Sequence, residues 1–307
     1  GVAGAMPIAF LLGNGTGIPA TFILVTLLML AFSVGYVAMA RHVKNAGAFY
    51  AYTVRGLGGQ AGGAVAMVAV LAYNAMQFGL IGLLGGISAG VFGGMGLTLP
   101  WWAYSLIAIV LVGFLGYRQV DLSAKVLTVL VLLEYLIVLV VDFAIIGKGG
   151  ASGLAFPLFD WGAIGSGSLT VAVLFCLGSF IGFEATTIYA EEARDPEKTI
   201  PRATYLSVLM IGVFYVFTTW LMIVGIGATE LVPMLAGLED PSALFFILAD
   251  TFVGGPIPVI AGLLLVTSLF AALSAFHNYI ARYSYVAGRD GLLPSAFGRT
   301  HDSHQSP

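Results

Sequence analysis

The sequence predicts an all-α protein that crosses a membrane many times. Hydrophobic residues make up 59% of its 307 residues and charged residues only 9%, whereas a soluble domain carries about 25% charged residues. The mean hydropathy is +1.01. Such a chain cannot cover its surface with charge, so lipid must replace water around much of it, and the recurring apolar runs are long enough to cross as helices.

Apolar runs of about 18 residues or more mark membrane-spanning helices. We expect seven spans, at 19–40, 62–91, 100–117, 122–146, 166–190, 203–226 and 256–287. A shorter run, 2–12, is expected to be the second half of a first helix, and 241–252 a short helix at the membrane surface. Residues 1–307 then form a single transmembrane domain.

The basic residues give this arrangement an orientation. Eleven of the twelve fall on one face if every span is real, and Lys148 falls on the other; the eleven are Arg41, Lys44, Arg55, Arg118, Lys125, Arg194, Lys198, Arg202, Arg282, Arg289 and Arg299. Because basic loops stay on the cytoplasmic side, we expect this face to be cytoplasmic in a multi-pass protein of the inner (plasma) membrane.

Three acidic residues, Glu134, Asp142 and Glu184, lie within expected spans. A charge at the bilayer centre costs about 2.5–3.5 kcal/mol on insertion scales, so such residues are functional candidates. No Lys or Arg lies at comparable depth, which leaves protonation, hydrogen bonding or a bound cation or amine. Glu184 and Glu134 are the candidates for proton coupling; the alternative is a protonated side chain that only packs. Asp142, nearer the outer end of its helix, is a weaker candidate.

Glycines also interrupt one span. Gly178 and Gly182 stand four residues apart around Ser179, and glycine weakens a helix interior by about 1 kcal/mol relative to alanine. A helix broken there would expose backbone groups that transporters use to bind substrates and ions. The alternative is close helix packing, the commoner use of Gly-xxx-Gly.

Polar groups gather on two further spans. Tyr73 and Gln77 share a helix face and Asn74 lies next to Tyr73; they either bond between helices or point at a substrate. His277 and Asn278 form a similar pair, for which we expect a structural role.

Enzyme signatures are absent from the sequence. It has no Walker A, HExxH or clustered metal-ligand motif, four histidines and a single cysteine, Cys176. We therefore expect no catalysis, no cofactor and no metal, and any transport must run on ion gradients or exchange. Nothing resembles the filter of a channel, and no nucleic acid partner is expected.

Three segments resemble the amino acid–polyamine–organocation permeases. GFEATTIYAEEARDPEKTIPRA (182–203) is similar to their helix 6 to helix 7 signature, RHVKNAGAFYAYTVRGLG (41–58) to their helix 2–3 loop, and RYSYVAGRDGLLP (282–294) to the end of their helix 8. The three occur in the family's order, on the face that the basic residues make cytoplasmic.

The resemblance implies the LeuT-like five-helix inverted-repeat transporter fold, here truncated: the chain would begin within helix 1 and stop after helix 8. Helices 1 and 6 would be unwound at mid-membrane, where they hold the substrate. Its implied substrate-binding residues on helix 6 are Gly178, Ser179, Phe180, Ile181, Gly182 and Phe183. Helices 3 and 8 would add Tyr73, Asn74, Gln77 and Phe276.

The sequence departs from the family at two positions. Glu134 stands where several members carry a lysine that replaces a sodium ion, and Gly178 where arginine/agmatine exchangers place a tryptophan. The lysine mechanism therefore does not carry over, and that exchanged pair is disfavoured as substrate.

We accordingly expect a secondary transporter of amino acids or related amines, working by proton-coupled symport or exchange through alternating access in the lipid bilayer. The alternatives are a sodium-coupled transporter of the same fold, and a non-transporting sensor or accessory subunit.

Glu184→Gln in the full-length protein should impair gradient-driven uptake while leaving membrane insertion intact, because the amide cannot take up and release a proton. Uptake assays in membranes at several pH values test this. Unchanged uptake that is still pH-dependent would exclude Glu184 as the coupling residue.

Overall fold

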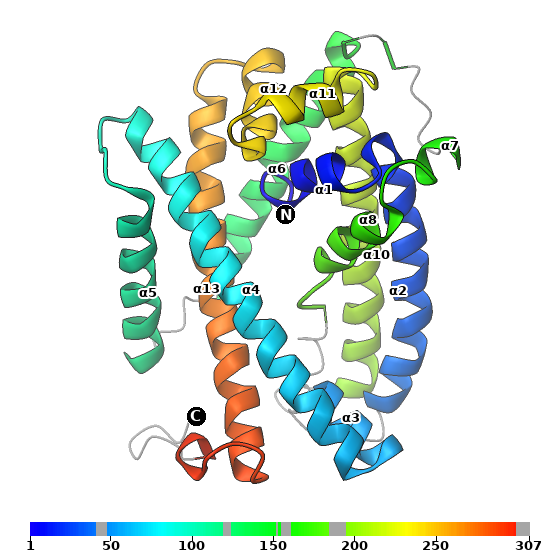
Figure 1. Cartoon of the computed structure of the whole chain (residues 1–307), viewed down its shortest axis with the longest axis vertical. Helices are drawn as coiled ribbons and strands as arrows, with labels where there is room; N and C mark the ends of the chain where they lie inside the picture. Colours follow the sequence, from blue (N-terminus) through cyan, green and yellow to red (C-terminus); the bar gives the residue numbers. More distant parts are fainter. Residues whose placement is uncertain (41–47, 119–123, 152, 155–160, 184–194, 299–307) are drawn as a thin grey trace. The chain divides into compact units, whose positions relative to one another are not determined.

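The computed structural model describes residues 1–40, 48–118, 124–151, 153–154, 161–183 and 195–298 (Figure 1). These residues form helices joined by turns and contain no strand. They divide into two compact units. Unit 1 comprises residues 1–38, 134–186 and 197–261, and unit 2 comprises residues 39–133, 187–196 and 262–307.

Five helical segments of the described chain are long and apolar enough to cross a membrane: Gly15–Ala40, Gly59–Gly94, Val129–Lys148, Lys198–Ile226 and Ile257–Arg289. This confirms the all-α polytopic membrane fold. Two expected spans, 100–117 and 166–190, correspond to the shorter apolar helices α5 (Trp101–Arg118) and α8 (Leu169–Gly178). α8 ends at Gly178, where the sequence predicts an interruption of the expected span 166–190.

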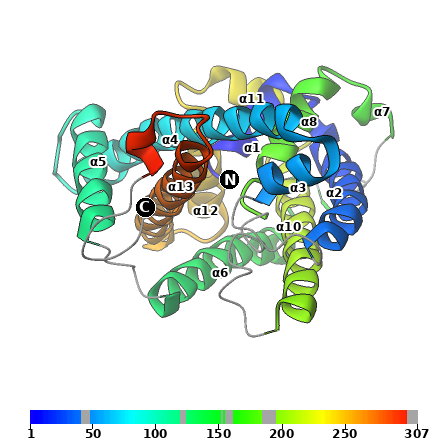
Figure 2. The ribbon, with the colours of Figure 1, turned by 90° about the horizontal axis from the view of Figure 1, so that it is seen from below.

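Unit 1 is built around two long helices, α2 (Ile18–Ala40) and α10 (Pro196–Ile226), which run side by side (Figures 1 and 2). Phe22 stacks on Tyr215 with ring centroids 5.0 Å apart and planes 6° apart. Gly212 lies so close to Thr26 that an added Cβ would be 2.3 Å from its hydroxyl oxygen. Glycine is therefore what allows these two helices to approach.

The remaining elements of unit 1 are shorter. They are α1 (Ala5–Leu12), η1 (Gly15–Gly17), α7 (Trp161–Ile164), α8, α11 (Leu231–Gly237), η2 (Pro241–Ala243) and α12 (Leu244–Phe252). α6 (Ala124–Lys148) contributes its second part to unit 1, from Glu134 onward.

A buried asparagine joins the start of the chain to the segment before α8. Asn14, 1% exposed, donates from Nδ2 to the Thr21 hydroxyl at 2.8 Å and to the Ile164 carbonyl at 3.2 Å. The Ser168 amide donates to the Gly13 carbonyl at 2.9 Å. These bonds hold the end of α1 beside the beginning of α8, and the two helices contact each other.

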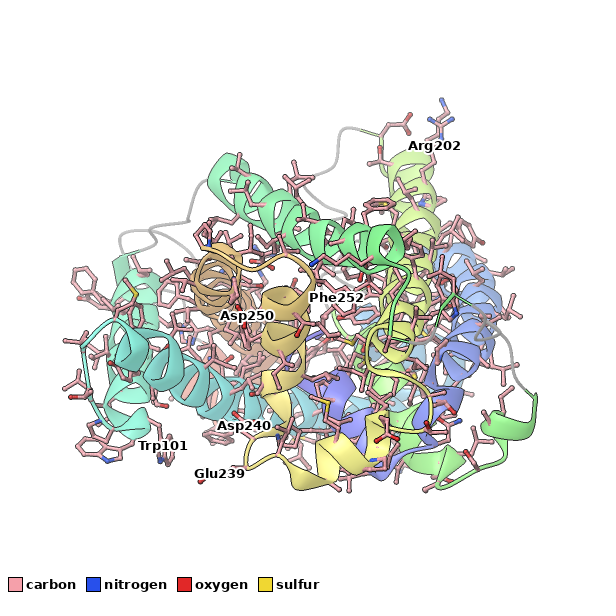
Figure 3. All side chains as sticks on the ribbon, turned by 90° about the horizontal axis from the view of Figure 1, so that it is seen from above. Trp101, Arg202, Glu239, Asp240, Asp250 and Phe252 are labelled. Atoms are coloured by element: carbon pink, nitrogen blue, oxygen red, sulfur yellow. The ribbon has the colours of Figure 1, made fainter. Side chains whose placement is uncertain are left out.

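The short helix expected at 241–252 is present as η2 followed by α12. The Asp240 side chain accepts hydrogen bonds from the amide and the hydroxyl of Ser242, at 2.9 and 2.7 Å, which fixes the start of η2. Figure 3 labels Asp240 and Phe252 at the two ends of this segment. At its far end, the Lys148 ammonium donates to the Thr251 carbonyl at 3.3 Å, a favourable place for a cation because helix C-termini are partially negative.

Unit 2 contains α3 (Ala48–Leu57), α4 (Gly59–Gly94), α5, most of α13 (Ile257–Arg289) and η3 (Ser295–Gly298). α4 packs against both α3 and α5. Ser105 of α5 donates to the Ile81 carbonyl of α4 at 3.0 Å. Tyr50 of α3 donates to Asp290 at 2.6 Å, and this hydrogen bond, with burial, raises the pKa of Tyr50 to about 12.

Candidate functional site

The interruption after α8 is the local feature from which the site is built. Ser168 caps the start of α8 by accepting from the Val171 amide. Beyond Gly178 the amides of Phe180, Ile181 and Phe183 each donate to the carbonyl three residues earlier, at 2.9, 3.3 and 3.1 Å. This is the tighter spacing of a helix end. Gly182 then takes a φ of +102°, which side chains other than glycine rarely adopt.

The start of α1 lies at the same place as the end of α8. The Gly1 carbonyl accepts from the first amides of α1, those of Ala5 and Met6, at 2.9 and 3.3 Å. Gly1 itself lies against the Tyr215 hydroxyl, so closely that an added methyl group would overlap it. The same hydroxyl interacts with the side chain of Ser179 at the end of α8. Tyr215 of α10 thus connects the two helix ends.

These two helix ends carry opposite partial charge. The N-terminus of a helix is equivalent to about +0.5 elementary charge and the C-terminus to about −0.5, each worth about 0.3–1 kcal/mol to a suitable ion at a surface. α1 presents its N-terminus at Tyr215 and α8 presents its C-terminus. A small molecule with both a carboxylate and an ammonium group has the matching pair of charges.

Glu134 belongs to the same part of unit 1. Its carboxyl acts electrostatically on the hydroxyl groups of Tyr135 and Tyr215, and its Oε1 is out of contact with solvent. α6 therefore places one predicted coupling residue near the predicted break. Glu184, the other, lies outside the described residues.

Aromatic side chains surround the residues of the break. Phe180 is 1% exposed and belongs to the core of unit 1, whereas Ile181 is 45% exposed. The Phe183 ring lies 5.6 Å from that of Tyr36 and 6.1 Å from that of Phe32, both on α2. Of the six predicted residues from Gly178 to Phe183, Phe180 is therefore a core residue that anchors the turn after α8 by packing inside unit 1.

The predicted residues of helices 3 and 8 belong to unit 2, on α4 and α13. Tyr73 is buried among the rings of Phe276, Tyr279 and Tyr283, with centroids 5.9, 6.0 and 5.3 Å away. The structure therefore brings Tyr73 and Phe276 together. The Asn74 amide donates to the Val70 carbonyl of its own helix at 2.8 Å.

Gln77 and His277 differ in their surroundings within unit 2. The buried Oε1 of Gln77 has no hydrogen-bond partner among the described residues, so it remains an available acceptor. His277 fills the space above Gly116 of α5, where an added Cβ would be 2.8 Å from Nε2. This contact agrees with the structural role expected for His277.

Sequence reasoning missed Tyr215. A tyrosine within an apolar run carries no local signal, and only the packing of α10 against α1, α2 and α8 reveals that its hydroxyl joins two helix ends. It also ranked Asp142 as a weaker candidate because solvation is cheaper near the outer end of a helix, whereas the protein buries this residue to 1% exposure. In the described part of the chain, no three His, Cys, Asp or Glu side chains gather so that they could hold a metal ion.

The described chain has long apolar helices, and α8 ends beside the start of a second helix. These features define a polytopic membrane protein with an all-α transporter fold. A family model for amino acid permeases matches residues 2–307, and the chain belongs to this family.

Relatives of named function are identical to it at about a quarter to a third of the aligned residues. It is 27% identical over 293 residues to the low-affinity putrescine importer PlaP of Escherichia coli (strain K12), covering 93% of this chain and 62% of PlaP. It is 26% identical over 316 residues to the branched-chain amino acid permease BcaP of Bacillus subtilis (strain 168), covering 95% and 64%. With the lysine-specific permease LysP of Lactococcus lactis subsp. cremoris (strain MG1363), identity is 32% over 222 residues, covering 66% and 42%. The chain thus spans less than two thirds of the length of these relatives.

Gly182→Ala should lower the free energy of unfolding by about 1–3 kcal/mol, because alanine resists the left-handed backbone that Gly182 adopts. Gly178→Ala is the matched control: it is the last residue of α8, and an added Cβ there meets nothing within 4 Å. Thermal unfolding of the two full-length variants in one detergent compares them. Equal stability of both variants would contradict the described turn.

Proposed function

We propose that the full-length protein is a secondary transporter of amino acids or related amines in the inner (plasma) membrane, coupled to protons and working by alternating access. Its basic loops face the cytoplasm. The function rests on one observation above all: the N-terminus of α1 and the C-terminus of α8 meet at Tyr215.

The opposite helix ends suit the two charged groups of an amino acid. The partially positive N-terminus of α1 attracts a carboxylate, as half-helix N-termini do in transporters, and the partially negative C-terminus of α8 attracts an ammonium group. The hydroxyl groups of Ser179 and Tyr215 supply hydrogen bonds between them. Substrates with one charged group would use one of the two ends, which is why amines are included.

Glu134 supports coupling to protons. A carboxyl beside the ammonium end of a substrate favours binding when it is ionised and weakens binding when it is protonated, because only the anion attracts a cation. Proton and cationic substrate therefore compete for Glu134, which links their movements.

The division of the chain into two units supports alternating access. α6 and α13 each contribute residues to both units, and the site around Tyr215 lies wholly in unit 1. Movement of unit 1 as a body would carry this site with it and bend α6 and α13 near the residues where the units divide. The relatives are in keeping with the substrate class, since their names are those of putrescine, branched-chain amino acid and lysine transport proteins.

Uptake of a panel of amino acids and diamines into proteoliposomes containing the full-length protein tests this function. An outward proton gradient, with the acidic side inside the vesicles, should drive accumulation in sodium-free buffer, because competition for Glu134 makes proton and cationic substrate exchange. Ser179→Ala should raise the KM by about tenfold, as expected for the loss of a hydrogen bond of about 1.5 kcal/mol to a charged group. Ser207→Ala is the matched control, because the Ser207 hydroxyl donates to the Thr204 carbonyl of its own helix, away from the two helix ends at Tyr215.

Glu134→Gln should abolish accumulation against a gradient while substrate exchange continues, because the amide binds no proton. Accumulation that needs sodium and not a proton gradient would replace the proposed coupling with sodium coupling. Substrate binding, seen as a raised thermal stability, without any flux would favour a sensor.

A further inference from the structure

Asp142 is the most deeply buried acidic side chain in the described chain. It lies on α6 and is 1% exposed, between Val141 at 1% and Ile145 on the next turn at 0%. Its Oδ2 accepts a hydrogen bond from the Thr218 hydroxyl of α10 at 2.8 Å, and Thr218 is 0% exposed. The burial of Asp142 comes from protein side chains of unit 1 and does not depend on the surrounding lipid.

No basic side chain of the described part of unit 1 lies within reach to balance a charge on Asp142. Unit 1 contains three basic residues, Lys148, Lys198 and Arg202. Lys198 and Arg202 are at the start of α10, sixteen residues or more before Thr218 and thus about 24 Å away along the helix. Lys148 is six residues after Asp142, and its ammonium donates to the Thr251 carbonyl at the end of α12. No ion pair with Asp142 is present among the described residues.

The other titratable groups on elements packed around Asp142 do not replace a cation. Glu134 precedes it on α6 by about two turns, and Tyr215 precedes Thr218 on α10 by three residues. α12 packs near Ile145 through Leu248 and carries one acidic residue, Asp250, which is exposed. At the end of α10 and the start of α11, Glu230 is exposed as well. Every one of these groups is neutral or acidic.

We propose that Asp142 is a proton-binding site, occupied in this conformation, whose protonated carboxyl joins α6 to α10 through Thr218. An ionised carboxylate in an apolar interior with one hydroxyl donor keeps too little of the stabilisation that water gives it. The neutral acid needs only the hydrogen bonds that a hydroxyl and a neighbouring carbonyl can offer. A proton is the ligand that this environment selects.

This site is separate from the proposed coupling residue Glu134. Asp142 ties the second part of α6 to unit 1, and α6 is one of the helices that pass from one unit to the other. While the proton is bound, α6 and α10 stay joined at this level. Release of the proton requires water to reach the pair, and hence requires the two helices to part. Asp142 therefore gives the α6–α10 contact a dependence on pH that does not depend on substrate.

Infrared spectroscopy of the full-length protein in lipid bilayers at neutral pH tests the proposal. The wild type should show a C=O stretching band of a carboxylic acid that moves to lower frequency in D2O. Asp142→Asn, which keeps the size of the side chain, should lose this band. Glu134→Gln should retain it, so the result stands apart from the outcome of the transport assay.

Thr218→Val should move the band to higher frequency, because a carbonyl that loses a hydrogen-bond donor has a stiffer C=O bond. Thr219→Val is the matched control: Thr219 is equally buried, but its hydroxyl bonds to the carbonyls of Tyr215 and Val216. This comparison decides the matter if Asp142→Asn fails to insert. A carboxylate band lost in Asp142→Asn, or equal spectra for Thr218→Val and Thr219→Val, would overturn the proposal.

Discussion

Inside a membrane every backbone amide and carbonyl needs a partner from the protein, because hydrocarbon offers none. The described chain meets this demand with helices almost everywhere, and one of its irregular stretches within an apolar segment is the end of α8. There the amides turn to carbonyls three residues back, and Gly182 supplies the left-handed backbone that lets the chain change direction. The end of α8 is partially negative. Its position beside the start of α1 and Tyr215 determines which charges the site in unit 1 attracts.

The surrounding residues follow from this one interruption. Asn14 and its hydrogen bonds hold α1 beside α8, so the positive end of one short helix comes to the negative end of the other. Tyr215 joins the two ends, and its ring is fixed by stacking on Phe22. Acidic side chains inside the membrane, like the backbone, need hydrogen-bond or charge partners from the protein or a ligand. Thr218 donates a hydrogen bond to Asp142, whereas Glu134 lies near the helix ends, where we propose that a charged substrate balances it.

Sequence reasoning succeeded where the information is local. Composition and apolar runs predicted an all-α membrane protein, and Gly178 and Gly182 predicted the interruption of the span at 166–190, which the structure has after Gly178. It was less successful where a property arises from packing between distant segments. The burial of Asp142 depends on α10, where its partner Thr218 lies 76 residues later, and its place along α6 indicated cheaper solvation instead. Nothing adjacent to Tyr215 marks it as the residue that joins two helix ends.

Hydrogen exchange measured by mass spectrometry on the full-length protein tests the central claim most directly. The amides of residues 179–183 should exchange faster than those of α8, because they stand outside regular helix, and a bound amino acid or amine should slow both these amides and those at the start of α1. Exchange at residues 179–183 as slow as within α8, and unchanged by any such compound that raises the thermal stability, would contradict the account: the helix would then be continuous, and the ligand would bind elsewhere.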